Sequence, residues 1–442
     1  MPDVTLYLQR LSYLLRQGKP ANDIAVFLPD DDVYASFSPG HASLSAGMPK
    51  YVTPALTQQI LDAGYNFDYI DAEAIEAVGV PYPVLVLPHV TRMSPELLKK
   101  IDDYRKNGGK VIAVGTLPSE APGVINAESI SNEVKSLAKA MFTPGSGASL
   151  VSNDDGLGEA LKKTIAPDFR VSSDVEDVGF LHRKLPDADV YFIANTSNRA
   201  VRASTSFRTT RAFASWWDPY SGATTSASLQ PELDLAPYES RVLVFTDKRL
   251  GAASKSYGPP VHLADLSHDW KVRFAGSTKE EDMPTLRSWT DQEQRRYFSG
   301  VATYTKEIDL SARQLKGKRL LLDFGEATPV TETRKVASGM RAMLESPVRE
   351  EAVVTINGER AGSVWHPPYA LDVTKQLHPG KNHLEVQVGN LGINALAGKT
   401  PADYRLLNAR YGERFIPQDV DHMEPLPSGL LGPVTLVGER VQ

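Results

Sequence analysis

Residues 83–115, PVLVLPHVTRMSPELLKKIDDYRKNGGKVIAVG, hold two short apolar runs on either side of a helical pattern. Short, continuous apolar runs are typical of parallel strands that are buried on both faces. Between them, Ser94 and Pro95 mark the start of a helix, because serine is a favoured N-cap and proline suits the first helical turn. The stretch therefore predicts a strand, a helix and a second strand, the unit of α/β sheets.

The same alternation extends towards the N-terminus. Two more apolar runs precede the stretch, IAVFL at 24–28 and FDYI at 67–70, and Thr53, followed by proline, marks another helix start. Residues 4–15 place their apolar side chains at helical spacing, which predicts an amphipathic helix. We predict that residues 1–172 form an open, doubly wound α/β domain.

Two β regions are predicted to follow. Residues 173–250 contain short runs rich in aromatic and β-branched residues between turn formers, which predicts a small β domain. Residues 251–262 show no periodicity and contain Gly-Pro-Pro, so we expect a linker there. The remaining segment, 263–442, has a clear hairpin signal in Asn357-Gly358, a pair that suits a type I′ turn.

Composition excludes several function classes. The formal net charge of the 442 residues is -6 and basic residues do not cluster, so we expect no nucleic-acid partner. The sequence contains no cysteine, which excludes disulfides, thiolate nucleophiles and cysteine metal sites. Apolar runs are too short for a transmembrane helix, and the first twenty residues lack the pattern of a signal peptide. We therefore expect no membrane partner, and localisation stays open.

The sequence offers few motifs for catalysis or cofactor binding. It contains neither GxGxxG nor GxxxxGK[ST], so no phosphate-binding loop is predicted, and HExxH is missing too. His89 follows a predicted strand, where a lone histidine is more often structural than catalytic. Carboxylates near the C-terminus could hold calcium, although a solvated loop is the favoured interpretation. This group is Asp419, Asp421, His422 and Glu424.

Segment 356–374, INGERAGSVWHPPYALDVT, combines a hairpin turn with a proline-stiffened aromatic loop and allows two interpretations. In the first, Val364, Trp365 and Tyr369 fill the interior of a β-sandwich, and the prolines occupy an edge where no ladder hydrogen bond is needed. In the second, the loop points Trp365 and His366 towards a sugar or a neighbouring domain. A flat aromatic ring suits sugar contact, because it covers the apolar face of a pyranose.

Several segments together resemble glycoside hydrolase family 106, the α-L-rhamnosidase-like enzymes. The matching stretches are YLQRLSYLLRQGKPANDIAVFLP, FLHRKLPDADVYFIANTSNRAV, WWDPYSG, LRSWTDQEQRRYFSGVATYTKEIDL, VTINGERAGSVWHPPYALDVTKQLHPGKNHLEVQVGNLGINALAG and LPSGLLGPVTL. The resemblance implies α/β plus all-β architecture. An N-terminal flavodoxin/amidotransferase-like open parallel sheet is followed by a small β-sandwich and a C-terminal galactose-binding-like jelly-roll.

The resemblance also implies where catalysis resides. In this family a (β/α)₈ barrel with two catalytic glutamates precedes the segment that begins here near Thr5, so we expect this chain to lack the barrel. We accordingly expect no catalytic residue, no metal site and no cofactor in this chain. The chain would be the C-terminal accessory region of an α-L-rhamnosidase-type enzyme that acts on plant or bacterial glycans. We expect it to be inactive alone, and to be periplasmic or extracellular if the full enzyme is exported. Alternatives are a self-standing carbohydrate-binding protein or an independent hydrolase.

The expected partners are therefore carbohydrate and the missing catalytic barrel. The candidate carbohydrate-binding residues are Trp365, His366, Tyr369, Asn390 and Asn394. The two asparagines lie in NLGINALAG, where many relatives have a bulkier pattern with Trp, Arg and Asp residues that this chain lacks.

Overall fold

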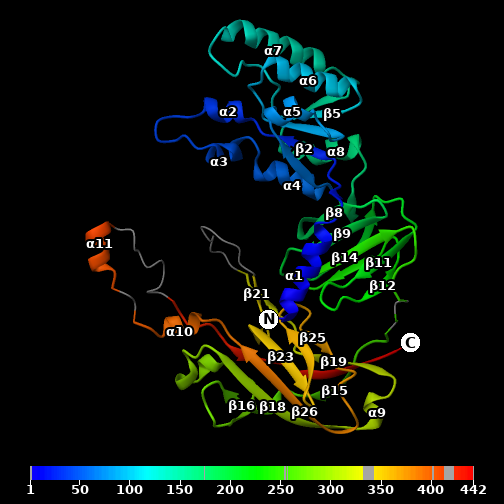
Figure 1. The fold of residues 1–442 in the computed structure, drawn as a ribbon, viewed down its shortest axis with the longest axis vertical. Helices are drawn as coiled ribbons and strands as arrows, with labels where there is room; N and C mark the ends of the chain where they lie inside the picture. The colour runs from blue at the N-terminus through cyan, green and yellow to red at the C-terminus, as the bar shows by residue number, and fades with distance from the viewer. Residues whose placement is uncertain are drawn as a thin grey trace.

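The computed structural model describes residues 2–173, 175–252, 255, 257–331, 343–400, 403–412 and 423–441. The fold is mixed α/β, with one parallel sheet and several antiparallel sheets stacked along the long axis of the molecule (Figure 1). Among these residues, no helix combines the length and the apolar character needed to cross a membrane.

The parallel sheet lies at one end of the molecule and confirms the strands predicted from the apolar runs (Figure 1). Its order is β3 (Phe67–Ile70), β2 (Ile24–Phe27), β4 (Val84–Pro88), β5 (Lys110–Val114) and β6 (Ala148–Val151). Every neighbouring pair is parallel. The three central strands are almost wholly buried, which explains why their sequences are continuously apolar.

Helices cover both faces of this sheet. One face packs on α4 (Pro54–Asp62) and α8 (Leu157–Thr164). The other packs on α5 (Ala72–Val78), α6 (Pro95–Lys106) and α7 (Ala127–Met141). The predicted N-caps are confirmed, since Thr53 Oγ1 accepts a hydrogen bond from the backbone of Leu56 and Ser94 Oγ from that of Leu97.

A second group of strands follows, all antiparallel. The larger sheet has the order β1 (Lys19–Pro20), β8 (Val178–Lys184), β9 (Ala188–Asn195), β14 (Ser240–Thr246), β11 (Phe213–Trp217) and β12 (Thr224–Ala227). The smaller has the order β13 (Glu232–Leu235), β10 (Val201–Phe207) and β7 (Phe169–Val171). An aromatic core that includes Tyr191 and Phe245 lies between them.

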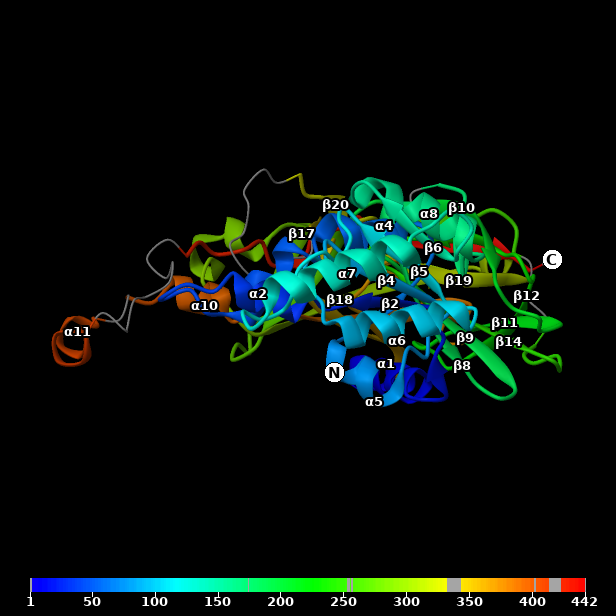
Figure 2. The ribbon, with the colours of Figure 1, turned by 90° about the horizontal axis from the view of Figure 1, so that it is seen from above.

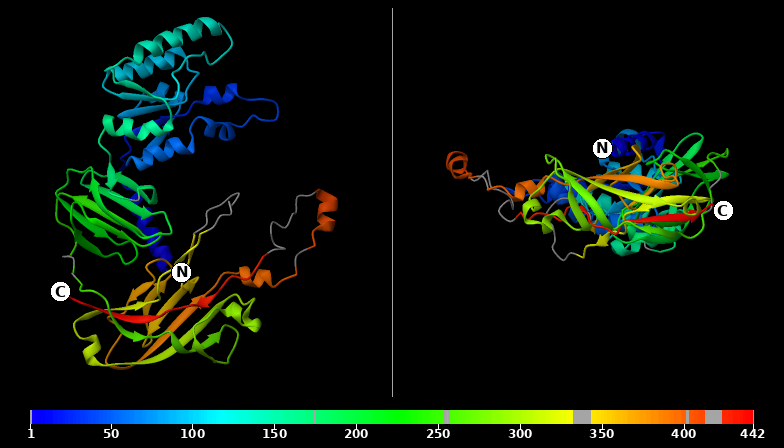
Figure 3. Two further views of the ribbon diagram at one scale, coloured as in Figure 1. Left: turned by 180° about the vertical axis from the view of Figure 1, so that it is seen from behind. Right: turned by 90° about the horizontal axis from the view of Figure 1, so that it is seen from below.

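The N-terminal helix differs from the expected layout, in which residues 1–172 belong together. Helix α1 (Pro2–Leu15) packs its Leu11 on Val190 and Val242 of the larger middle sheet, and β1 pairs with β8. Figure 3 shows α1 running from this sheet towards the last group of strands. Its helical spacing predicts an apolar stripe but carries no information about which sheet covers that stripe.

The last group of strands consists of two facing sheets with one shared core. The first sheet has the order β17 (Glu281–Thr285), β16 (His268–Phe274), β18 (Val301–Leu310), β26 (Gly380–Gly389), β23 (Glu351–Ile356) and β24 (Glu359–Val364). The second has the order β15 (Val261–Asp265), β28 (Thr435–Arg440), β19 (Lys318–Asp323) and β25 (Ala370–Asp372). Strand β15 thus begins inside the expected linker 251–262.

The predicted hairpin is confirmed, because Asn357 and Gly358 join β23 to β24 with φ of 52° and 80°, the positive values that a type I′ turn requires. Short pairs complete this group: β20 (Thr328–Pro329) with β21 (Leu344–Glu345), and β22 (Val348–Arg349) with β27 (Gly429–Leu430). The remaining helices are α2 (Asp30–Ala35), α3 (Leu44–Gly47), α9 (Ala312–Leu315), α10 (Ile393–Ala397) and α11 (Arg405–Tyr411). Figure 2 shows α11 lying well apart from the sheets.

Candidate functional site

The aromatic loop after β24 lies at the junction between the last group of strands and α1. Trp365 is half-buried, and its ring meets Tyr7 of α1 edge-on, with centroids 5.7 Å apart and an interplanar angle of 73°. It also meets Tyr220, in the turn between β11 and β12, at 5.7 Å. His366 stacks on Tyr220 at 3.8 Å, and Tyr7 stacks on the same ring at 4.4 Å. These four rings therefore form one cluster, here called the junction cluster.

Polar contacts strengthen this junction. Asp3 of α1 pairs with Arg360 of β24 at 2.6 Å and accepts a hydrogen bond from Ser363. Burial raises the pKa of Asp3, but these hydrogen bonds outweigh it and hold the pKa below its usual value. Arg10 donates to the backbone carbonyl of Pro219, next to Tyr220. Helix α1 thus contacts both the middle sheets and the last sheets.

The other candidate carbohydrate-binding residues lie inside the last group of strands. Tyr369 is 7% exposed and belongs to its core. Asn394 is buried and donates to Ser428 Oγ at 3.0 Å, and Asn390 Nδ2 donates to the same atom at 3.0 Å. Of the two interpretations of the loop, Tyr369 fits the interior role, while Trp365 contacts a neighbouring part of the chain. Sugar contact at these residues stays a prediction.

A histidine–carboxylate pair lies at the carboxyl edge of the parallel sheet, where ligands of such sheets usually bind. His89 directly follows β4 with a φ of 49°, and its Nε2 lies 2.8 Å from Asp154 Oδ1. Thr53 Oγ1 donates to the other oxygen of Asp154 at 2.6 Å. A Cβ on Gly115 would lie 2.4 Å from His89 Nδ1, so the imidazole rests against this glycine. Both nitrogens therefore face the protein, which favours a structural role.

Asp32 makes the second polar contact at this edge. It is 1% exposed, and its carboxylate accepts hydrogen bonds from the backbone N–H groups of Thr91 at 2.8 Å and Arg92 at 3.1 Å. The Arg92 guanidinium also reaches Asp32 at 3.3 Å and Glu120 at 2.6 Å. The charges of Asp32, Arg92 and Glu120 are thus paired with one another. Sequence reasoning missed Asp32 and Asp154, because only the fold brings them beside the end of β4.

A charged cluster joins the parallel sheet to the middle sheets. His182, 5% exposed, places Nδ1 2.9 Å from Asp168 and Nε2 3.4 Å from Asp189. Arg208 lies 3.7 Å from Asp168 and also pairs with Asp23, the residue before β2. Because both imidazole nitrogens face carboxylates, the doubly protonated ring fits this site.

The charges around His182 shift its titration. Burial lowers the pKa of His182, but hydrogen bonds and charges from Asp168 and Asp189 outweigh this effect and raise the pKa above its usual value. Burial raises the pKa of Asp189, whereas hydrogen bonds from His182 and Thr209 outweigh it and lower the pKa. Tyr191 stacks on the imidazole at 3.9 Å, and its hydroxyl donates to Asp168. The cluster stabilises a contact between two parts of the fold.

The structure gives no support for a metal centre in the part of the chain that it describes, where no group of three or more histidine and carboxylate side chains is placed to hold an ion. Of the predicted acidic group, Asp419, Asp421 and His422 lie outside the described residues, so the calcium hypothesis stays a prediction.

Comparison with known proteins shows similarity to a protein family, to a curated protein and to solved structures. A family model described as alpha-L-rhamnosidase, glycoside hydrolase 106, matches residues 2–230. A protein of Formosa agariphila named "Putative beta-glucuronidase" is 29% identical over 228 residues, which is 49% of this chain and 18% of the relative. The solved structure of a rhamnosidase from Novosphingobium sp. PP1Y matches 99% of this chain at 22% identity, with a TM-score of 0.71. This chain spans 41% of that rhamnosidase.

Proposed function

Because this chain belongs to the glycoside hydrolase 106 family of α-L-rhamnosidases, we propose that it is an accessory region of a rhamnosidase-type enzyme whose catalytic barrel lies outside the described residues. One observation carries this proposal: nearly the whole chain has the fold of less than half of a solved rhamnosidase. A (β/α)₈ barrel needs eight parallel strands closed into a ring. In the described residues, parallel strand ladders are confined to one sheet of five strands, of which β3 and β6 are the open edges, and the other parallel pairings are isolated bridges.

The finer architecture is part of the same proposal. The strand order β3-β2-β4-β5-β6 corresponds to 2-1-3-4-5 in chain order, the order of flavodoxin-like sheets, which supports a flavodoxin/amidotransferase-like first domain. The two middle sheets enclose one core, which supports a small β-sandwich in the middle of the chain. The two sheets of the last group of strands enclose another core, which supports a galactose-binding-like jelly-roll at the end. We retain the domains 1–172, 173–250 and 263–442, with the difference that α1 packs on the second.

In this proposal the junction cluster has a positioning role. Tyr7, Tyr220, Trp365 and His366 hold the last group of strands against α1, and so orient any surface that this group presents to the barrel. Burial lowers the pKa of His366, and its Nδ1 lies 2.7 Å from the carbonyl oxygen of Pro367, so the neutral ring donates within its own loop. Glycan contact in this region would use the part of Trp365 that remains exposed.

The experiment is to express the reading frame that contains this chain, extended upstream of the codon for Met1, and to assay the product with an aryl α-L-rhamnoside. The accessory proposal expects an in-frame barrel and hydrolysis by the extended product. An upstream stop codon and promoter, with a shorter product that binds glycans without hydrolysis, would support the self-standing carbohydrate-binding protein instead.

A further inference from the structure

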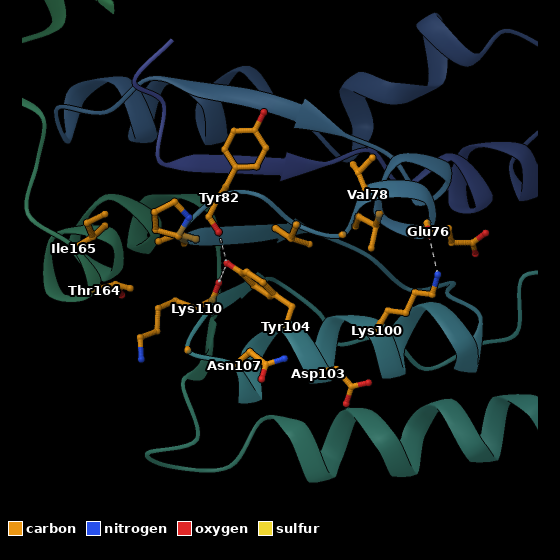
Figure 4. Close-up of a pocket in the computed structure, with 17 residues that line it drawn as sticks. Glu76, Val78, Tyr82, Lys100, Asp103, Tyr104, Asn107, Lys110, Thr164 and Ile165 are labelled. Atoms are coloured by element: carbon orange, nitrogen blue, oxygen red, sulfur yellow. Dashed lines mark hydrogen bonds between the residues drawn. The ribbon is translucent and has the colours of Figure 1, made fainter. Parts of the chain in front are cut away.

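An open groove of about 860 Å³ lies at the amino edge of the parallel sheet, opposite to the edge that holds His89 and Asp154. This volume is within the range of small-ligand sites. The groove begins at the first residues of β4 and β5 and is bordered by the C-terminal ends of α5, α6 and α8 (Figure 4). We call it the amino-edge groove. The lining residues that matter here are Val78, Tyr82, Lys100, Asp103, Tyr104 and Lys110.

The centre of the groove offers a fixed aromatic surface. The hydroxyl of Tyr104 donates to the backbone carbonyl of Tyr82 at 2.9 Å and lies 3.3 Å from that of Lys110. Burial raises the pKa of Tyr104 to about 12, so the hydroxyl stays protonated as a donor. These contacts fix the ring between the segment that leads into β4 and the first residue of β5. Val78 at the rim is 73% exposed and adds apolar surface.

The polar groups around the ring include both donors and acceptors. Figure 4 shows Lys100 and Lys110 on opposite sides of Tyr104, with Asp103 and Asn107 beside it. In the part of the chain that the structure describes, no carboxylate lies within ion-pair distance of either lysine, and Lys100 Nζ donates to the Glu76 carbonyl at 3.0 Å. The last turns of α5, α6 and α8 add backbone carbonyl groups, which make the C-terminal end of a helix rich in hydrogen-bond acceptors and partly negative.

We propose that the amino-edge groove is a non-catalytic binding site for a neutral saccharide. A sugar hydroxyl donates one hydrogen bond and accepts others, so it matches a site that combines ammonium donors with carboxylate, amide and carbonyl acceptors. The apolar face of the sugar ring packs on Tyr104 and Val78. Phosphate is disfavoured, because anions bind at helix N-termini whereas C-termini surround this groove. The proposal goes beyond the accessory function, since binding here requires no barrel.

The test measures binding to the full chain by saturation-transfer NMR and isothermal titration. The neutral probes are methyl α-L-rhamnoside and methyl β-D-glucoside, and glucuronate is the anionic probe. The variants are Lys110→Ala and Val78→Arg, both at exposed side chains, so that the fold is retained. Lys99→Ala is the matched control, because Lys99 is an exposed lysine of helix α6, which borders the groove, and it pairs with Glu133 away from the lining residues.

We expect at least one neutral probe to bind, Lys110→Ala and Val78→Arg to weaken its binding about tenfold or more, and Lys99→Ala to leave it unchanged. Absence of saturation transfer from both neutral probes would overturn the proposal. So would equal binding by wild type and both groove variants, which would place the sugar elsewhere. Preferential binding of glucuronate would overturn the neutral class. Each result is independent of rhamnoside hydrolysis by the extended product, so failure here is distinguishable from failure of the accessory function.

Discussion

The junction cluster predicts a measurable coupling between Tyr7 and Trp365. Trp365→Ala removes the ring pairs with Tyr7 and Tyr220, each worth about 1 kcal/mol, so we expect the free energy of unfolding to fall by about 2 kcal/mol. A fully buried tryptophan would cost about 3 to 5 kcal/mol, and an exposed one less than about 0.5 kcal/mol. The half-buried position of Trp365 gives a value between these limits.

The assay is a double-mutant cycle of Tyr7→Ala and Trp365→Ala, with urea unfolding followed by circular dichroism. We expect a coupling free energy of about 1 kcal/mol, the value of one edge-on ring pair. Tyr7→Phe is the control, because it keeps the ring and removes only the hydroxyl, which contacts Ser240 at 2.7 Å; losing this hydrogen bond costs about 1 kcal/mol. Additive effects of the two alanine substitutions, within about 0.3 kcal/mol, would refute the contact between α1 and the aromatic loop.

Two further predictions concern the parallel sheet and its contact with the middle sheets. His182→Gln should lower the free energy of unfolding by about 2 kcal/mol near pH 6, because it removes the cation that lies between Asp168 and Asp189 and leaves them only the more distant Arg208 and Arg211, at 3.7 and 3.8 Å. Since the folded state raises the pKa of His182, its stabilisation is complete below the unfolded pKa of about 6.5 and is lost as pH rises through the folded pKa. The melting temperature of the wild type should therefore fall above about pH 6.5 more steeply than that of the variant, and parallel curves would contradict this role. Gly115→Ala should destabilise the chain by about 1 to 3 kcal/mol, because φ is 75° and the new Cβ meets His89; an unchanged melting temperature would contradict the packing described.

Local signals in the sequence predicted the elements of the fold well. Thr53 and Ser94 cap helices because their side chains bond backbone groups three residues away, and Asn357-Gly358 forms its turn through its own backbone preferences. The central strands of the parallel sheet were evident because both of their faces are buried, so no polar residue interrupts them.

Contacts between distant segments could not be predicted in the same way. Tyr7 and Trp365 are separated by most of the chain, and nothing in the pattern of α1 specifies that its partner is the middle sheet. His182 lies near Asp189 in sequence, but its contact with Asp168, and that of Asp168 with Arg208, depend on how β7, β8 and β10 are arranged. The amino-edge groove likewise depends on the packing of three helix ends, which one-dimensional periodicity does not encode.

The accessory role is tested most directly by incubating the purified chain with an aryl α-L-rhamnoside. The account predicts no hydrolysis above the buffer background, because the described strands form an open sheet and antiparallel sheets and no parallel barrel. A heat-inactivated sample serves as the control for contaminating activity. Hydrolysis that survives rigorous purification and disappears on heating would contradict the account.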